Sequence, residues 1–266
     1  MCSQPPRQKE DLNFHYQLNK LLVYLMPNGK LSLGITGGEP TLLGEKLNDL
    51  IDSIFHKNND SSVHLLSNGR HFANKGYAAS FARFAEKDFM IGIPLHSDYS
   101  KDHDEIAGAY GAYDQTLKGL YQLALHEVSV EIRIVINRLN YNRLPQLSRY
   151  IFQNFPFVRH IAFMGLEATG LAVKNKKQVW VSPADYVDQL EAAVTELADW
   201  KMNVSIYNIP LCQLKPTLYS FAKRSISDWK ESYLDLCAEC LLQSECCGIF
   251  STAQYSDRAH IKPILD

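Results

Sequence analysis

Residues 31–41 read LSLGITGGEPT, an apolar run that ends at two glycines, a glutamate and a proline. The run Leu31–Thr36 predicts a short buried strand. Because they lack a Cβ, Gly37 and Gly38 allow positive φ angles and a close approach of the backbone to a ligand. The carboxylate of Glu39 can accept hydrogen bonds from an ammonium group held against that backbone. The alternative is a tight strand-to-helix turn with a water-facing glutamate, and the glycine spacing excludes a Walker phosphate loop and a Rossmann fingerprint.

Short apolar runs alternate with amphipathic segments along the rest of the chain. Further strands are expected at residues 63–66, 89–95, 128–136, 160–164 and 204–207. Helices are expected at residues 10–26, 42–56, 70–86, 114–126, 144–154 and 183–200, with Thr41 and Ser182 as N-caps. This order predicts βαβ units, a parallel sheet and therefore an α/β fold. Ligands bind such sheets at the carboxyl ends of the strands.

Candidate binding residues lie at or near those strand ends. They are Ser67, Asn68, His96, Ser97, Arg133, Asn137, Gly165 and Glu167. An arginine in an otherwise apolar strand needs a partner or a ligand if it points inward. Other interpretations stay open, because Ser-Asn-Gly is an ordinary turn sequence and a histidine can serve the core by bonding to backbone. The acidic stretch at residues 102–105, DHDE, could hold a metal, but we expect a solvated loop there.

The six cysteines are placed unevenly, at Cys2, Cys212, Cys237, Cys240, Cys246 and Cys247. The last four crowd into one short stretch, and thiolates so arranged select zinc or iron–sulfur clusters. Four thiolates suit a tetrahedral zinc site, and the spacing does not separate zinc from a cluster. Reduced cysteines without a metal are the third interpretation, although four thiols so close together are unusual without an ion. We expect a core domain at residues 1–205 and a small cysteine-rich appendage at residues 206–266.

Composition restricts the class of protein. Hydrophobic residues make up 46% of the 266, enough for a large core. With 27 Lys and Arg against 29 Asp and Glu, the chain has no basic field that would drive nucleic-acid binding. No run approaches the roughly 18 apolar residues of a membrane span. Because the chain begins without a basic and then apolar leader, we expect a cytoplasmic protein that binds neither nucleic acid nor membrane.

Several of these segments resemble one enzyme family. The strand that ends in Gly37-Gly38-Glu39-Pro40-Thr41 resembles the second-strand motif of radical S-adenosylmethionine (SAM) enzymes. The opening MCSQPP resembles the end of that superfamily's CxxxCxxC loop, as found in the His-Xaa-Ser system radical SAM maturases. Further similarity lies at residues 104–106, 113–117, 237–240 and 246–248, so the resemblance runs nearly from end to end.

The resemblance implies a partial (β/α)6 radical SAM barrel that lacks its first strand, with a cluster-binding appendage. Gly37, Gly38, Glu39 and Pro40 would form the turn that grips the SAM amino group. The remaining candidates, Ser67, Asn68, His96, Ser97, Arg133 and Asn137, would serve the SAM carboxylate, the ribose and the substrate. Met164, Gly165 and Glu167 would border the adenine.

The family chemistry requires a [4Fe–4S] cluster and SAM, which together generate a 5′-deoxyadenosyl radical. An auxiliary [4Fe–4S] cluster on Cys212, Cys237, Cys240 and Cys246 is also implied, with Cys247 as a spare thiol. The implied activity is modification of a peptide or small protein that carries His-Xaa-Ser repeats, and a second maturase is a conceivable partner.

One departure from the family pattern bears on activity. The core cluster needs three thiolates and this chain supplies only Cys2, so we expect the first strand and the other two cysteines to be encoded before Met1. The 266-residue chain should then be a poor catalyst. The alternatives are a non-catalytic metal-binding subunit of a second maturase, and a zinc-stabilised binding module.

Overall fold

The computed structural model describes residues 30–167, 169–224, 231–250 and 260–265. The expected helix at residues 10–26 and Cys2 lie outside these residues. None of the described helices is long and apolar enough to cross a membrane.

A six-stranded sheet forms the centre of the fold, with its strands in sequence order. The strands are β1 (Ser32–Ile35), β2 (Ser62–Leu66), β3 (Phe89–Pro94), β4 (Val130–Ile136), β5 (His160–Gly165) and β6 (Val204–Tyr207). β1, β2 and β3 pair in parallel, and so do β5 and β6. All six expected strands are therefore present, and the predicted parallel α/β fold is confirmed.

The described α-helices are α2 (Glu45–Lys57), α3 (Lys75–Ser80), α4 (Ser100–Ala107), α5 (Ala112–Leu125), α6 (Leu144–Asn154), α7 (Leu171–Lys174), α8 (Lys176–Val179) and α9 (Pro183–Asp199). Short 3-10 helices are η1 (Pro40–Leu43), η2 (Arg70–Ala73), η3 (Ala82–Phe84), η4 (Tyr141–Arg143), η5 (Leu211–Gln213), η6 (Pro216–Phe221), η8 (Asp235–Glu239) and η9 (Gln243–Glu245). A small antiparallel pair, β7 (Glu231–Ser232) and β8 (Ile249–Phe250), lies in the cysteine-rich region.

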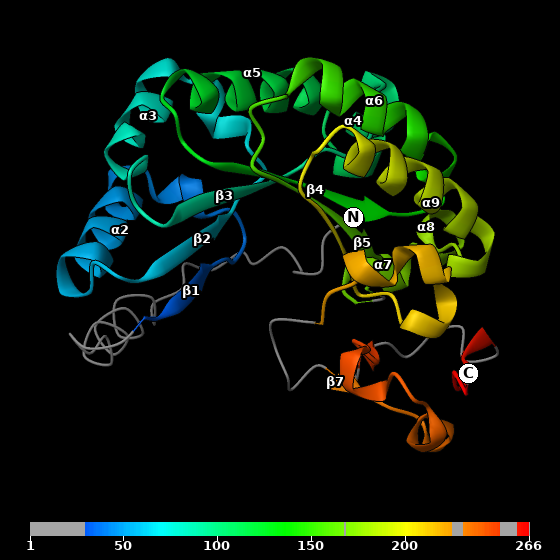
Figure 1. Ribbon diagram of the computed structural model, residues 1–266. Coiled ribbons are helices and arrows are strands. Elements are labelled where there is room, and N and C mark those ends of the chain that lie inside the picture. Colours follow the sequence, from blue (N-terminus) through cyan, green and yellow to red (C-terminus); the bar gives the residue numbers. More distant parts are fainter. Residues whose placement is uncertain (1–29, 168, 225–230, 251–259, 266) are drawn as a thin grey trace. The chain divides into compact units, whose positions relative to one another are not determined.

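The chain divides into two compact units, and the first comprises residues 30–94 and 112–131 of the described chain. Its helices α2, α3 and α5 lie on one side of strands β1 to β3 (Figure 1). Val63 and Leu65 of β2 are buried and alternate with partly exposed neighbours, whereas Ile91 of β3 lies in a run of three buried residues. The alternation in β2 means that one face of this strand packs on the core while the other is partly exposed.

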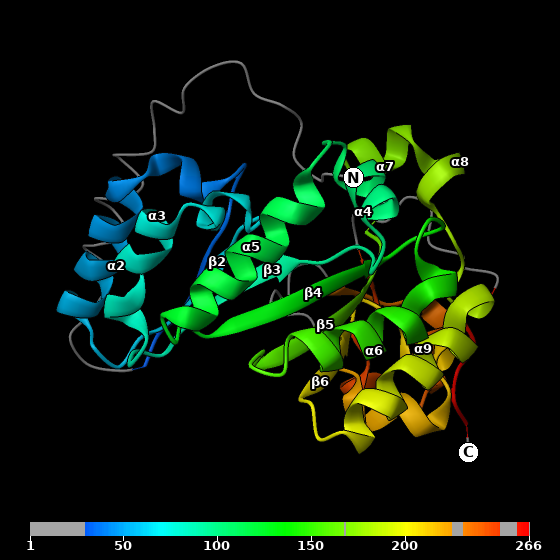
Figure 2. The same cartoon turned by 90° about the horizontal axis from the view of Figure 1, so that it is seen from above.

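The second unit comprises residues 95–111 and 132–265 of the described chain. Helices α6 and α9 lie side by side in it and pack against each other (Figure 2). Its core includes the fully buried Phe163, Leu190 and Val194. The domain boundary expected after residue 205 falls inside β6, which pairs with β5 over Val204–Tyr207.

Two local predictions are wrong. The stretch at residues 102–105 is not a loop but lies in α4, which Gly108 ends in a left-handed conformation. His103 and Ile106 of α4 are buried one helical turn apart, so one side of this helix packs on the core. The charged residues around them make this helical pattern hard to recognise in the sequence. Thr41 does not cap a helix, because η1 precedes α2 and the side chain of Glu39 caps η1 instead.

The expected helix at residues 70–86 is also broken, into η2, α3 and η3. Aromatic rings explain how such short pieces hold together. Phe72, Phe81 and Phe84 are fully buried, and Phe81 makes edge contacts with the other two rings. Tertiary packing, not helix propensity, therefore fixes this segment.

Gly119 lets α5 contact the turn that follows β2. A Cβ at this position would lie 2.2 Å from the carbonyl oxygen of Gly69 and 3.3 Å from Cβ of Phe72. We therefore expect Gly119→Ala to push α5 off the turn and to lower the free energy of unfolding by about 3 kcal/mol, as measured by urea denaturation. Gly76→Ala in α3 is the matched control. Its nearest atom would be 3.5 Å away, so it should be neutral or stabilising by about 0.5–1 kcal/mol. Equal stability of the two variants would contradict this account.

Candidate functional site

The Gly-Gly-Glu turn at the carboxyl end of β1 presents bare backbone. Gly37 has φ +154°, which favours glycine, and both Gly37 and Gly38 are exposed. A Cβ built on either glycine has no described atom within 4 Å. The local packing therefore does not demand glycine at these positions, whereas close approach of a ligand to the backbone would.

Glu39 connects this turn to the turn after β2. Its Oε1 accepts hydrogen bonds from Thr41 N (3.1 Å), Thr41 Oγ1 (2.7 Å) and Ser67 Oγ (2.8 Å). Its Oε2 accepts one from Asn68 N (2.7 Å). The half-buried carboxylate is therefore fixed by four donors from two loops and does not simply face water. A carboxylate offers about four lone-pair sites, so Oε2 keeps acceptor capacity for a cation.

Ser67 and Asn68 form the turn that supplies two of those donors. Ser67 Oγ also accepts a hydrogen bond from Gly69 N (3.1 Å), and Gly69 has φ +79°. The carbonyl oxygen of Asn68 accepts a hydrogen bond from Thr116 Oγ1 of α5 (3.3 Å). The structure thus brings the predicted residues Glu39, Ser67 and Asn68 together within the first unit.

In the second unit, His96 follows β3 and is buried. Its backbone N donates to His103 Nδ1 (3.2 Å), and its carbonyl oxygen accepts from Asn140 Nδ2 (2.9 Å). Burial, helped by the neighbouring His103, lowers the pKa of His96 to about 3, so the ring is neutral. Burial also lowers the pKa of His103, to about 4. The Nδ1 atom of His96 is buried without a hydrogen-bond partner among the described residues, so the ring can still serve a ligand.

Ser97 and Asn137 are both fully buried and bond to nearby backbone. Ser97 Oγ accepts from Tyr99 N (3.1 Å). The side chain of Asn137 donates to Val135 O (3.0 Å) and accepts from Leu139 N (2.9 Å). Both polar atoms of the Asn137 amide are engaged in shaping the loop after β4, which is a structural role.

Arg133 and the end of β5 contact each other. Nη2 of the half-buried Arg133 donates to Met164 Sδ (3.1 Å). A Cβ at Gly165 would lie 2.5 Å from the carbonyl oxygen of Asn208, so close packing against the segment after β6 already explains this glycine. Glu167 is half-buried, and its carbonyl oxygen accepts from Thr169 N (2.9 Å).

Two features near these strand ends were not predicted. Arg143 forms a bidentate ion pair with Asp98, with Nε–Oδ1 at 2.9 Å and Nη2–Oδ2 at 2.6 Å. This pair joins the loop after β3 to η4. The second feature is a contact of His71 and Tyr77 with the carbonyl oxygen of Thr41. Neither was visible in the sequence because both join residues some 30 to 45 positions apart.

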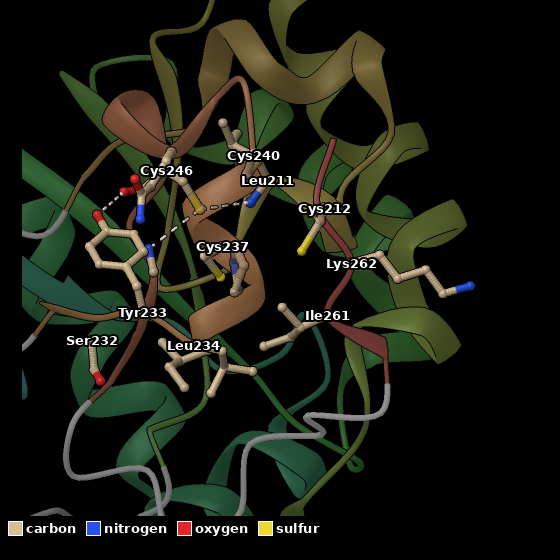
Figure 3. Close-up of a pocket in the computed structure, with 14 residues that line it drawn as sticks. Leu211, Cys212, Ser232, Tyr233, Leu234, Cys237, Cys240, Cys246, Ile261 and Lys262 are labelled. Atoms are coloured by element: carbon tan, nitrogen blue, oxygen red, sulfur yellow. Dashed lines mark hydrogen bonds between the residues drawn. The ribbon is translucent and has the colours of Figure 1, made fainter. Parts of the chain in front are cut away.

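A pocket in the cysteine-rich region brings together the four candidate metal ligands. Figure 3 shows the thiols of Cys212, Cys237 and Cys246 directed into it. Apart from Cys240, the other lining residues are mainly apolar: Pro210, Leu211, Ser232, Tyr233, Leu234, Gln243, Gly248, Ile249, Ile261 and Lys262. The buried Cys247 does not line the pocket, and its Sγ donates to the carbonyl oxygen of Gly248 (3.3 Å).

Backbone N–H groups point at these sulfur atoms. Cys246 Sγ accepts hydrogen bonds from Leu211 N and Gly248 N, both at 3.4 Å, and Cys240 Sγ accepts one from Ile264 N at 3.4 Å (Figure 3 draws the first two). Burial raises the pKa of the Cys212 thiol, and the three neighbouring thiols raise it further. Hydrogen bonds from backbone N–H groups, such as those to Cys240 and Cys246, stabilise thiolate ligands. In the part of the chain that the structure describes, however, no three Cys, His, Asp or Glu side chains converge on one metal-ion position.

No family model matches the chain, but it is similar to one curated protein and to several solved structures. Bacillus subtilis (strain 168) AlbA, an antilisterial bacteriocin subtilosin biosynthesis protein, is 27% identical over 124 residues, which are 47% of this chain and 27% of AlbA. Streptococcus suis SuiB bound to precursor peptide SuiA matches with a TM-score of 0.61 and 17% identity, over 77% of this chain and 44% of SuiB. The structure of anSMEcpe with bound AdoMet and a Cp18Cys peptide matches with a TM-score of 0.57 and 18% identity, over 74% and 55%.

These similarities define the fold class. The chain shares the partial (β/α) barrel fold of SuiB and anSMEcpe, the kind of fold that the resemblance of its Gly-Gly-Glu strand implied. It spans between about a quarter and about half of the lengths of the three proteins named above.

Proposed function

We propose that this chain is a radical SAM maturase, or a part of one, and that it modifies a peptide or small protein. The observation that carries the proposal is the carboxylate of Glu39, fixed by four donors beside the bare backbone of Gly37 and Gly38. It is supported by the likeness to anSMEcpe, which is described with bound AdoMet, and to SuiB, which is described with its precursor peptide.

The turn fits the amino group of SAM. An ammonium group needs acceptors at close range, and Glu39 Oε2 and the nearby backbone carbonyls can supply them. The glycines leave room for the methionine part of the ligand to lie against the backbone. In the second unit, His96 and Arg133 remain predicted ligand-binding residues, whereas Asn137 and Gly165 would act by shaping their loops.

The proposed chemistry depends on two bound groups. SAM and a reduced [4Fe–4S] cluster together supply one-electron chemistry that removes a hydrogen atom from an unactivated carbon. One thiolate cannot hold a cubane cluster, so this function requires two thiolates besides that of Cys2, either from residues before Met1 or from a partner. The chain's own residues would bind and orient SAM and keep water out of the site.

For the pocket of Cys212, Cys237, Cys240 and Cys246 we propose an auxiliary [4Fe–4S] cluster. A structural zinc site needs its ligands about 2.3 Å from a single ion. Among the described residues no three ligands converge in that way, although four thiols line one pocket. The choice of a cluster over zinc rests on the resemblance of the cysteine spacing to the cluster-binding appendages of the family.

The proposed substrate is a ribosomally made peptide or small protein with His-Xaa-Ser repeats. Support for a peptide substrate in general comes from SuiB, which is described bound to a precursor peptide, and from anSMEcpe, which is described with a bound peptide. The repeat itself rests on the sequence resemblance described above. A second maturase as partner stays a prediction, as does a cytoplasmic location.

Co-expression tests this function. A gene extended upstream to restore the CxxxCxxC cysteines would be expressed with the repeat protein, and the repeat protein analysed by mass spectrometry. We expect a mass change that disappears when the restored cysteines are replaced by alanine. An unmodified target, in the presence of intact clusters and reductant, would refute the substrate assignment. A zinc-containing, colourless protein would favour a non-catalytic binding module instead.

A further inference from the structure

His71 lies outside the residues assigned to ligand binding, yet it contacts the Gly-Gly-Glu turn. Its Nδ1 is 2.9 Å from the carbonyl oxygen of Thr41. A carbonyl oxygen only accepts hydrogen bonds, so Nδ1 of His71 must carry the proton in this contact. The geometry therefore specifies the protonation of one ring nitrogen in the first unit.

Tyr77 donates to the same carbonyl oxygen. Its hydroxyl lies 3.3 Å from Thr41 O, and its ring stacks on that of His71 with 4.2 Å between centroids and 17° between planes. Burial, helped by the negative charge of Glu39, raises the pKa of Tyr77, so the phenol stays a donor. The two stacked rings, His71 of η2 and Tyr77 of α3, therefore both donate to the carbonyl oxygen of Thr41 in η1.

Thr41 transmits this contact to Glu39. It is fully buried, and both its N and its Oγ1 donate to Glu39 Oε1. Thr41 therefore donates hydrogen bonds to the Glu39 carboxylate, and its own carbonyl oxygen accepts hydrogen bonds from His71 and Tyr77. The Thr41 carbonyl carbon is bonded to the Thr41 Cα, and the N–H of the same peptide group, that of Leu42, donates to the Glu39 carbonyl oxygen (3.2 Å). A shift of this carbonyl would therefore displace the Thr41 Cα and, with it, both donors to the Glu39 carboxylate.

We propose that His71, supported by Tyr77, is a positioning residue that keeps the Glu39 carboxylate oriented for the SAM amino group. This inference rests on the proposed function, because it assigns His71 a role in the same ligand site. His71 does not touch the ligand. It acts through Thr41, and it does so as the Nδ1–H form.

The test uses three substitutions in the full chain. The side-chain amide of His71→Asn can place an N–H near the position of Nδ1, His71→Gln places it near the position of Nε2, and His71→Ala removes it. We expect the Kd for SAM, measured by equilibrium dialysis, to rise about tenfold in His71→Ala and His71→Gln, the loss of one hydrogen bond. His71→Asn should stay within about threefold of the parent, and thermal unfolding shows whether each variant is folded.

Two further readouts do not depend on SAM. The 15N chemical shifts of the His71 ring should show a protonated Nδ1 in the parent chain. Hydrogen exchange of the amides at residues 39–44 should be faster in His71→Ala than in His71→Asn. A neutral His71 with its proton on Nε2, or a folded His71→Ala with parental SAM affinity, would overturn the inference. A parent chain that shows the expected shifts and exchange but binds no SAM would refute the proposed function and leave the contact established.

Discussion

Glu39→Ala should lower the affinity for SAM about 100-fold. The substitution removes the carboxylate that directly follows Gly37 and Gly38 in the turn after β1. A charge-assisted hydrogen bond to an ammonium group accounts for up to about 3 kcal/mol, which corresponds to that factor. The four donors to this carboxylate, Thr41 N, Thr41 Oγ1, Ser67 Oγ and Asn68 N, would also lose their acceptor. Equilibrium dialysis with labelled SAM measures the effect.

Ser67→Ala is the graded control for this prediction. It removes one of the four donors to Glu39 and leaves the carboxylate in place. We expect a loss of SAM affinity of only about threefold to tenfold, because one neutral partner is removed. Circular dichroism would show that both variants keep their secondary structure. If Glu39→Ala bound SAM as tightly as the parent, the Gly-Gly-Glu turn would not be the binding site for the amino group.

The sequence was sufficient to predict the sheet. Its strands are short apolar runs bounded by turn residues, and their alternation with amphipathic segments is a local property that needs no knowledge of the fold. The 3-10 and short helices between residues 70 and 86 were not predictable in the same way, because packing of Phe72, Phe81 and Phe84 overrides propensity there.

The candidate site was predictable only in part. Gly37, Gly38 and Glu39 adjoin in sequence, so their turn could be recognised. Glu39 meets Ser67 across 28 positions, and no local pattern encodes the geometry of that contact. The same is true of His71, whose partner Thr41 lies 30 positions away.

Sequence alone also could not separate ligand contact from packing. Gly165 looked like a ligand-facing glycine, but the carbonyl oxygen of Asn208 occupies the space next to it. Asn137 looked like a candidate for hydrogen bonds to a ligand, whereas its amide bonds to the backbone of its own loop. In both cases the residue type was informative, and only the neighbours revealed which role it serves.

The cysteine pocket allows the second prediction with a large effect. After anaerobic reconstitution with iron and sulfide, the parent chain should bind an iron–sulfur cluster, and Cys246→Ser should lose most of it. Cys246 lines the pocket and accepts two backbone N–H groups, so its sulfur is already oriented for a ligand role. We expect its replacement to lower iron and sulfide per chain by more than fivefold and to remove most of the visible absorption of the cluster.

Cys247→Ser is the matched control because it changes the adjacent thiol. Cys247 is buried, but it does not line the pocket and its Sγ bonds to the backbone of Gly248. This variant should keep its iron and sulfide within about a third of the parental values, since no ligand is removed. Equal retention in both variants would show that Cys246 is not a ligand. A parent chain that binds one zinc and no sulfide would instead require the four thiols to close on a single ion, a rearrangement of the pocket because zinc needs its ligands within about 2.3 Å.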